Sequence, residues 1–111
     1  MGACDFRTFS TGKTAREAFN AAVNSAQWDH GHAGYTGTIA EKHSFVSIPE
    51  KIDPAEPLKA RREAAIQAAN RLIEAGDQRI DDKWGPAGCI DCGPGDKAGE
   101  RLFLFFGWAS S

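Results

Sequence analysis

Leu102-Phe103-Leu104-Phe105-Phe106-Gly107-Trp108, near the C-terminal end of the chain, is apolar at nearly every position. Successive side chains of a β-strand point to opposite faces of a sheet, so this run places large apolar groups on both faces. Such a pattern is typical of a strand in the middle of a sheet. The sequence therefore predicts a central strand over residues 101–109.

The stretch before this strand predicts a hairpin. Gly93-Pro94-Gly95-Asp96-Lys97-Ala98-Gly99 is rich in glycine and proline, which is typical of a loop. We expect residues 88–92 to form the partner strand on the other side of this loop. At the other end of the chain, residues 4–10 alternate aromatic and polar side chains, which favours a first strand there.

Two segments carry helix signals. Thr14-Ala15-Arg16-Glu17 is a capping box, and the apolar stripe behind it predicts a helix that runs to about Trp28 and ends at Gly31. Asp53-Pro54-Ala55-Glu56 combines an N-cap aspartate with proline at the first helical position. We expect the second helix to begin there and to end at Gly76.

Residues 36–48 are rich in β-branched and aromatic side chains and predict strand. Ile39 and Phe45 share one face by alternation, but Val46 and Ile48 do not share it. Either a bulge breaks one strand, or residues 41–44 form a turn between two short strands. We favour two strands.

These elements predict a single α+β domain over residues 1–111, in the order β-α-β(β)-α-β-β. The sheet is expected to be small, antiparallel or mixed, with four to five strands and two amphipathic helices. The helices are placed most simply on one face, which leaves aromatic side chains of the last strand on an open face unless long loops cover it. Exposed apolar surface of that kind marks an interface, so we expect a homo-oligomer, a dimer or larger.

The composition excludes several classes of protein. The net charge is −2, from 13 basic and 15 acidic residues, and this balance argues against an obligatory nucleic-acid partner. No apolar run approaches the roughly 18 residues of a membrane span, and no signal peptide is visible at the N-terminus. Three cysteines are an odd number, which fits reduced thiols in the cytoplasm.

Residues 30–43 hold all three histidines and the only tyrosine, interleaved with glycines. A tyrosine stacks on a base, threonine hydroxyls and a lysine contact phosphate, and histidine changes charge near neutral pH. The alternative is structural, with Gly37 allowing close packing and Tyr35 at the edge of the core. The predicted ligand-binding residues for an anionic small molecule are Trp28, His30, His32, Tyr35, Thr36, Thr38, Lys42, His43, Arg61 and Trp84.

Cys89-Ile90-Asp91-Cys92 is a C-x-x-C motif that supplies two ligands of a zinc site. His30 and His32 are the candidates for the other two ligands. The alternative is that both cysteines are small packed residues. A redox pair is disfavoured because no amphipathic helix follows the motif. We expect no cofactor, with zinc as the exception.

Catalytic patterns are weak. Glu41 and His43 are close enough in sequence to form an acid–base pair, but an exposed turn is the more common outcome. No nucleophile elbow or H-E-x-x-H motif accompanies them. The sequence favours a protein without enzymatic activity.

Residues 34–42, 83–88 and 105–110 resemble segments of small uncharacterised proteins of tailed phages and prophages. The resemblance implies stoichiometric binding in the host cytoplasm. The leading hypothesis is an anti-defence factor that sequesters an anionic small molecule such as a nucleotide signal. The alternatives are an inhibitor that binds a host protein through the exposed aromatic sheet face, and a zinc protein that uses the C-x-x-C and H-x-H residues.

Overall fold

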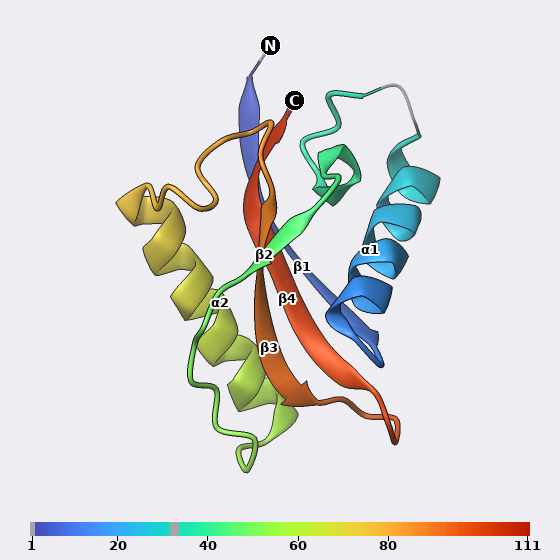
Figure 1. Ribbon diagram of the computed structural model, residues 1–111, viewed down its shortest axis with the longest axis vertical. Helices are drawn as coiled ribbons and strands as arrows, with labels where there is room; N and C mark the ends of the chain where they lie inside the picture. The colour runs from blue at the N-terminus through green and yellow to red at the C-terminus, as the bar shows by residue number, and fades with distance from the viewer. Residues whose placement is uncertain (1, 32–33) are drawn as a thin grey trace.

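A computed structural model describes residues 2–31 and 34–111 and shows a mixed sheet of four strands with two helices (Figure 1). The strand order is β1-β4-β3-β2, in which β4 is antiparallel to β1 and β3, and β2 is parallel to β3. The elements are β1 (Ala3–Gly12), α1 (Ala15–His30), the 3-10 helix η1 (Ile39–Glu41), β2 (Phe45–Ser47), α2 (Leu58–Ala75), β3 (Ala87–Pro94) and β4 (Arg101–Ser110). The predicted α+β class and element order are confirmed.

β4 lies inside the sheet and contributes to a core on each face. Leu102, Leu104 and Phe106 pack in the core beneath α2, whereas Phe103 and Phe105 pack in the core beneath α1. All five side chains are at most 4% exposed. The prediction that both helices lie on one face is therefore wrong, and so is the expected open aromatic face. A sheet with one edge strand of only three residues is narrow enough for one helix to cover each face.

The signals that end the helices are confirmed, but one start is wrong. Thr14 caps α1 by accepting a hydrogen bond from Glu17 N at 3.2 Å, and Gly76 ends α2 in the left-handed conformation. Asp53 accepts from Ala55 N at 2.9 Å, but this bond belongs to a separate turn. The helix begins only after Pro57, because the residue before a proline avoids the helical conformation.

The segment predicted as two strands contains one. η1 occupies the first half, where the Thr38 hydroxyl accepts from Ala40 N at 3.2 Å, and only β2 follows as strand. The assignment of faces survives this correction. Ile39 contributes to the core beneath α1, whereas Val46 and Ile48 pack in the core beneath α2.

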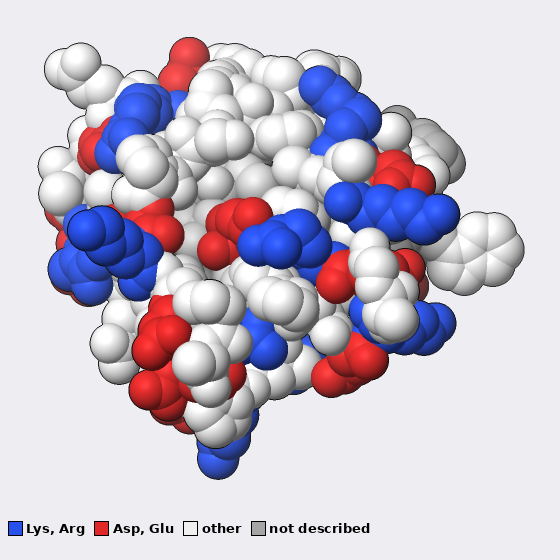
Figure 2. Space-filling model, turned by 60° about the horizontal axis from the view of Figure 1, so that its bottom comes forward, with Lys and Arg blue, Asp and Glu red and all other residues white. Residues whose placement is uncertain are grey.

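Basic and acidic side chains are interspersed on the face shown in Figure 2, including a red and a blue one side by side at its centre, and the larger uncharged area lies above them. Neither helix in the described part of the chain has the length and apolar character needed to cross a membrane.

Candidate functional site

Two loops meet at the end of the sheet where Gly2 pairs with Ser111 (Figure 1). One loop leads into η1 and is held to β4 by a hydrogen bond of 2.8 Å from Gly37 N to Ser110 O. The other is the turn at residues 82–86, between α2 and β3. They carry Tyr35 and Trp84, two of the three aromatic side chains predicted to bind the ligand.

The loop at Tyr35 is held by hydrogen bonds within the segment. The Thr36 hydroxyl donates to Glu41 Oε2 at 2.8 Å, Thr36 N donates to the same oxygen at 3.2 Å, and the Thr36 and Thr38 hydroxyls lie 2.8 Å apart. These bonds stabilise a backbone in which Tyr35 has φ of 57°, an uncommon value for a residue other than glycine. The two threonines that we expected to contact phosphate are thus engaged with the protein.

Glu41 is the acceptor at the centre of this network. Partial burial by itself would raise the pKa of the Glu41 carboxyl, but hydrogen bonds to the carboxylate, the largest of them from Thr36, together hold the pKa below the usual 4.5. The carboxylate is therefore charged at neutral pH, which makes each of its hydrogen bonds stronger than a neutral one.

Lys42 joins the two loops. Its side chain is only 2% exposed, and Nζ donates to the carbonyls of Asp82, Lys83 and Gly85 at 3.2, 3.3 and 2.8 Å. Burial lowers the pKa of the Lys42 ammonium, and the nearby Asp82 carboxylate opposes that shift. The expected role of Lys42 in contacting a ligand is not what the geometry favours, because its donors are used to fix the turn that carries Trp84.

The turn presents Trp84 beside Tyr35. Asp82 builds the turn by accepting from Trp84 N at 2.8 Å through its side chain and from Gly85 N at 2.9 Å through its carbonyl. The rings of Tyr35 and Trp84 meet edge to face, with centroids 6.3 Å apart and planes at 82°. They stay 51% and 60% exposed.

Lys83 completes this surface. Its Nζ lies 5.3 Å from the centre of the Trp84 ring and also donates to Gly2 O at 3.3 Å. We name Tyr35, Trp84 and Lys83 the aromatic platform. Lys83 was not among the predicted ligand-binding residues, although its position next to a candidate stacking tryptophan was a signal for it.

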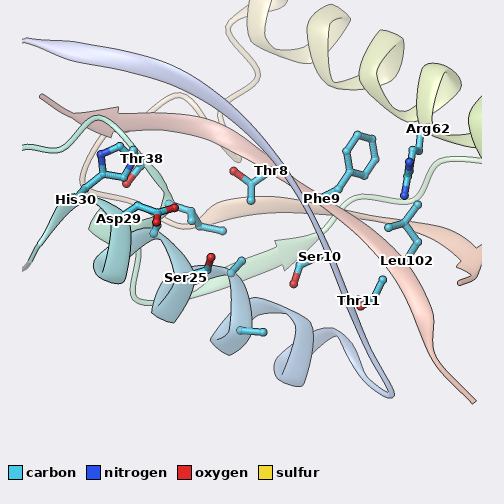
Figure 3. Close-up of a pocket in the computed structure, with 14 residues that line it drawn as sticks. Thr8, Phe9, Ser10, Thr11, Ser25, Asp29, His30, Thr38, Arg62 and Leu102 are labelled. Atoms are coloured by element: carbon cyan, nitrogen blue, oxygen red, sulfur yellow. The ribbon is translucent and has the colours of Figure 1, made fainter. Parts of the chain in front are cut away.

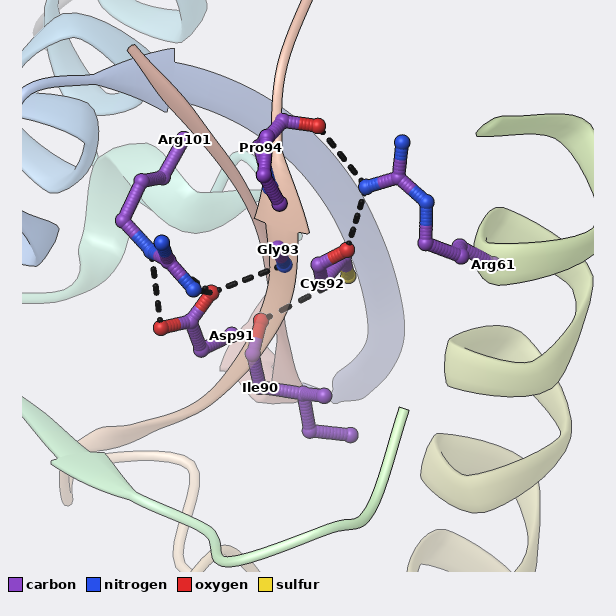
Figure 4. Close-up of polar contacts among 7 residues, drawn as sticks. All are labelled: Arg61, Ile90, Asp91, Cys92, Gly93, Pro94 and Arg101. Atoms are coloured by element: carbon purple, nitrogen blue, oxygen red, sulfur yellow. Dashed lines mark hydrogen bonds and ion pairs between the residues drawn. The ribbon is translucent and has the colours of Figure 1, made fainter. Parts of the chain in front are cut away.

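Arg61 is not available at the platform. It is 8% exposed, and its Nη1 donates to the carbonyls of Cys92 and Pro94, both at 2.7 Å, while Nε donates to Glu56 O at 3.0 Å (Figure 4). It connects the start of α2 to the β3–β4 hairpin. A cation that satisfies three carbonyls inside the protein has a structural role, and the predicted ligand contact is not supported by its position.

The remaining predicted residues are scattered. Trp28 projects from α1 and is 90% exposed. His30, at the end of α1, lines a groove along β1, and His43 lines a small hollow of about 200 Å³ together with Glu41. His32 lies outside the described residues.

Cys89 and Cys92 lie on opposite faces of the sheet. Cys89 packs in the core beneath α1 and Cys92 in the core beneath α2. Burial raises the pKa of the Cys89 thiol to about 12 and that of Cys92 to about 11, and the Asp91 carboxylate adds to both shifts. A zinc site needs both sulfurs on one side, so the positions of Cys89 and Cys92 do not favour the predicted use of the pair. β3 runs extended through the motif, where a zinc knuckle would turn.

Clusters suited to a metal ion are absent from residues 2–31 and 34–111: no three His, Cys, Asp or Glu side chains converge there.

A groove of about 550 Å³ runs along β1, and sequence reasoning missed it (Figure 3). α1 contributes Ser25 and Asp29 on one side of the strand, and Arg62 of α2 lies on the other. Thr8 and Ser10 of β1 line its floor. The signal for it was the hydroxyl-rich second half of the first strand.

Comparison of the chain with family models, with curated proteins and with solved structures gave no match.

Proposed function

We propose that this is a cytoplasmic binding protein that holds an anionic aromatic small molecule, of nucleotide chemistry, at the aromatic platform without turnover. The observation that carries the proposal is the pairing of Tyr35 with Trp84. The two rings come from distant parts of the chain, stay half exposed, and lie beside the ammonium of Lys83.

The platform has the chemistry that such a ligand needs. In an edge-to-face pair the edge of one ring covers part of a face of the other, and Lys83 lies over Trp84, so a base would stack on the ring surface that remains exposed. Stacking of a base on an aromatic side chain contributes about 1–3 kcal/mol. The Lys83 ammonium, which lies over the Trp84 ring, supplies a positive charge for a phosphate beside the rings. The rings and the cation together account for affinity towards both halves of a nucleotide.

The loops are fixed before any ligand arrives. The Thr36–Glu41 bonds hold one loop, and the three bonds from Lys42 hold the other. Ordering a loop on binding costs free energy, and a site that is already ordered avoids that cost. The fixed loops therefore support the proposal that this surface binds a ligand.

The narrower role that we propose is sequestration of a nucleotide signal by a phage-encoded anti-defence factor. Its only support is the resemblance of residues 34–42, 83–88 and 105–110 to phage proteins. The platform is compatible with that role because sequestration requires affinity and no catalytic group.

The alternative, a host-protein inhibitor that binds through an exposed aromatic sheet face, is disfavoured because that face is not exposed. Phe103, Phe105 and Phe106 are buried in the two cores. A protein partner would have to use other exposed residues, and the titration below distinguishes it from a small ligand.

The test is a calorimetric titration of the protein with mononucleotides, linear dinucleotides and cyclic dinucleotides. We expect one class to bind, and Tyr35→Ala and Trp84→Ala each to weaken it at least tenfold, which corresponds to about 1.4 kcal/mol. Trp28→Ala is the matched control, because Trp28 is exposed on α1 and should leave affinity unchanged. Absence of binding by every class, or equal affinity of all three variants and the wild type, would overturn the proposal.

A further inference from the structure

β1 is a long strand with one open edge. It is the outermost strand of the sheet and pairs with β4 over ten residues without a shift in register. The opposite edge strand, β2, has only three residues. A long, regular edge presents unpaired backbone groups and binds another strand unless something blocks it.

The backbone hydrogen bonds show which residues of β1 face this edge. Gly2 and Ser111 exchange both N–H···O bonds, at 3.0 and 3.1 Å. In an antiparallel pair such mutual bonds recur at every second residue. The even-numbered residues of β1 therefore bond to β4, and Asp5, Arg7 and Phe9 direct their N–H and C=O groups outward.

We propose that two copies of this chain dimerise by antiparallel pairing of their β1 edges, with Phe6 opposite the partner's Phe6. In this register Asp5 lies opposite the partner's Arg7, and Arg7 opposite the partner's Asp5. Both members of each pair direct their backbone groups outward, so they exchange two hydrogen bonds. The two sheets become one continuous sheet across the two-fold axis.

Charge selects this register over its neighbours. A shift of one residue would set inward-facing groups opposite outward-facing ones and lose the hydrogen bonds. A shift that keeps the hydrogen bonds sets Arg7 opposite the partner's Arg7 in one direction. In the other direction it sets Asp5 opposite the partner's Asp5. Like charges directly opposite one another destabilise a strand pair, whereas opposite charges stabilise it.

The shape of the edge agrees with this register. The second half of β1 lines the groove of about 550 Å³ between α1 and Arg62, so the partner's residues opposite it enter this groove (Figure 3). The pairing places the partner's Ala3 beside Phe9 and the partner's Gly2 beside Ser10, so small residues of the partner lie along this groove. The charged pairs lie nearer the open first half, where Asp5 and Arg7 are exposed.

The experiment is sedimentation velocity of the wild type, Asp5→Arg and Arg7→Asp over a concentration series. We expect a dimer for the wild type and a monomer for each variant, because each variant sets like charges opposite one another. An equimolar mixture of the two variants should form a heterodimer. Positions 5 and 7 are both arginine in one variant and both aspartate in the other, so opposite charges face each other in both pairs. Arg71→Asp, on the exposed surface of α2, is the control and should remain a dimer.

The experiment with mixed variants distinguishes ion pairs between two copies from the ion pair within one copy. Asp5 and Arg7 also form an ion pair within the chain at 3.1 Å, and both variants lack it. Recovery of a dimer in the mixture therefore has to come from pairs between copies, and it also shows that both variants are folded. A wild type that stays monomeric, a variant that still dimerises alone, or a mixture that stays monomeric would each overturn the proposal. No ligand is involved, so failure here leaves the proposed function unaffected.

Discussion

At the scale of single residues, several charged side chains act inside the protein. The Nζ of Lys42 and the Nη1 of Arg61 donate to backbone carbonyls of segments more than thirty positions away along the chain. Glu41 also bonds within the protein, because its carboxylate accepts hydrogen bonds from the hydroxyl and the amide of Thr36. Each side chain fixes a loop, and two of these loops present the aromatic platform.

Glu41 makes stability depend on pH. Its folded pKa lies below the unfolded value, so the stabilisation is complete at neutral pH and is lost as the pH falls through the folded pKa. We expect Glu41→Gln to lower the free energy of unfolding by about 1 kcal/mol at neutral pH. The difference from wild type should shrink in acid. Urea denaturation across the pH range measures it, with the exposed Glu74→Gln as control; a difference that is constant with pH would contradict the assignment.

At the scale of elements, the helices are connected to the sheet by more than apolar packing. Arg61, in the first turn of α2, bonds the end of β3 through the carbonyls of Cys92 and Pro94 (Figure 4). Asp91 lies on the other side of the same strand, where it pairs with Arg101 of β4 at 3.1 Å. The β3–β4 hairpin is thus held on both faces of the sheet.

Arg61→Ala should loosen the contact between α2 and this hairpin. It leaves three carbonyls without their donor in a largely buried place, and we expect a loss of about 3 kcal/mol in the free energy of unfolding. Arg71→Ala, which removes an exposed ion pair to Glu50, should cost less than about 1 kcal/mol. Chemical denaturation of both variants tests this, and equal losses would show that Arg61 has no special structural role.

At the scale of the whole molecule, one sheet divides two cores, and each helix closes one of them. Phe105 and Phe106 are adjacent in sequence, fully buried, and belong to different cores. Because β4 supplies both cores, the loss of one removes support from the other. We therefore expect the two cores to open together.

The rates at which the cysteine thiols react measure that opening. Cys4 is exposed, whereas Cys89 and Cys92 are buried in separate cores with thiol pKa values raised to about 12 and about 11. We expect one thiol to react quickly with an aromatic disulfide reagent in native protein. The other two should react slowly and at one shared rate, set by global unfolding. Two clearly different slow rates would mean that the cores open independently, and Cys4→Ser identifies the fast thiol.

Much of the local structure was predictable from neighbouring residues. The continuous apolar run of residues 102–106 predicted a central strand with apolar side chains on both faces, and Thr14 and Gly76 mark a helix start and a helix end as expected. Tyr35 and Trp84 were also candidate binding residues, and the fold brings them together. These signals depend on the conformations that a residue and its near neighbours prefer.

By itself, then, the sequence determined the fold class, the order of the helices and strands, and the apolar faces, because hydrophobic periodicity and caps act within a few residues. Only the tertiary structure decided that the helices cover opposite faces and that Cys89 and Cys92 lie apart. It also decided that Lys42 and Arg61 bond to backbone carbonyls. Whether a cation meets a ligand or a carbonyl depends on segments that folding brings close, and burial makes any unpaired partner costly.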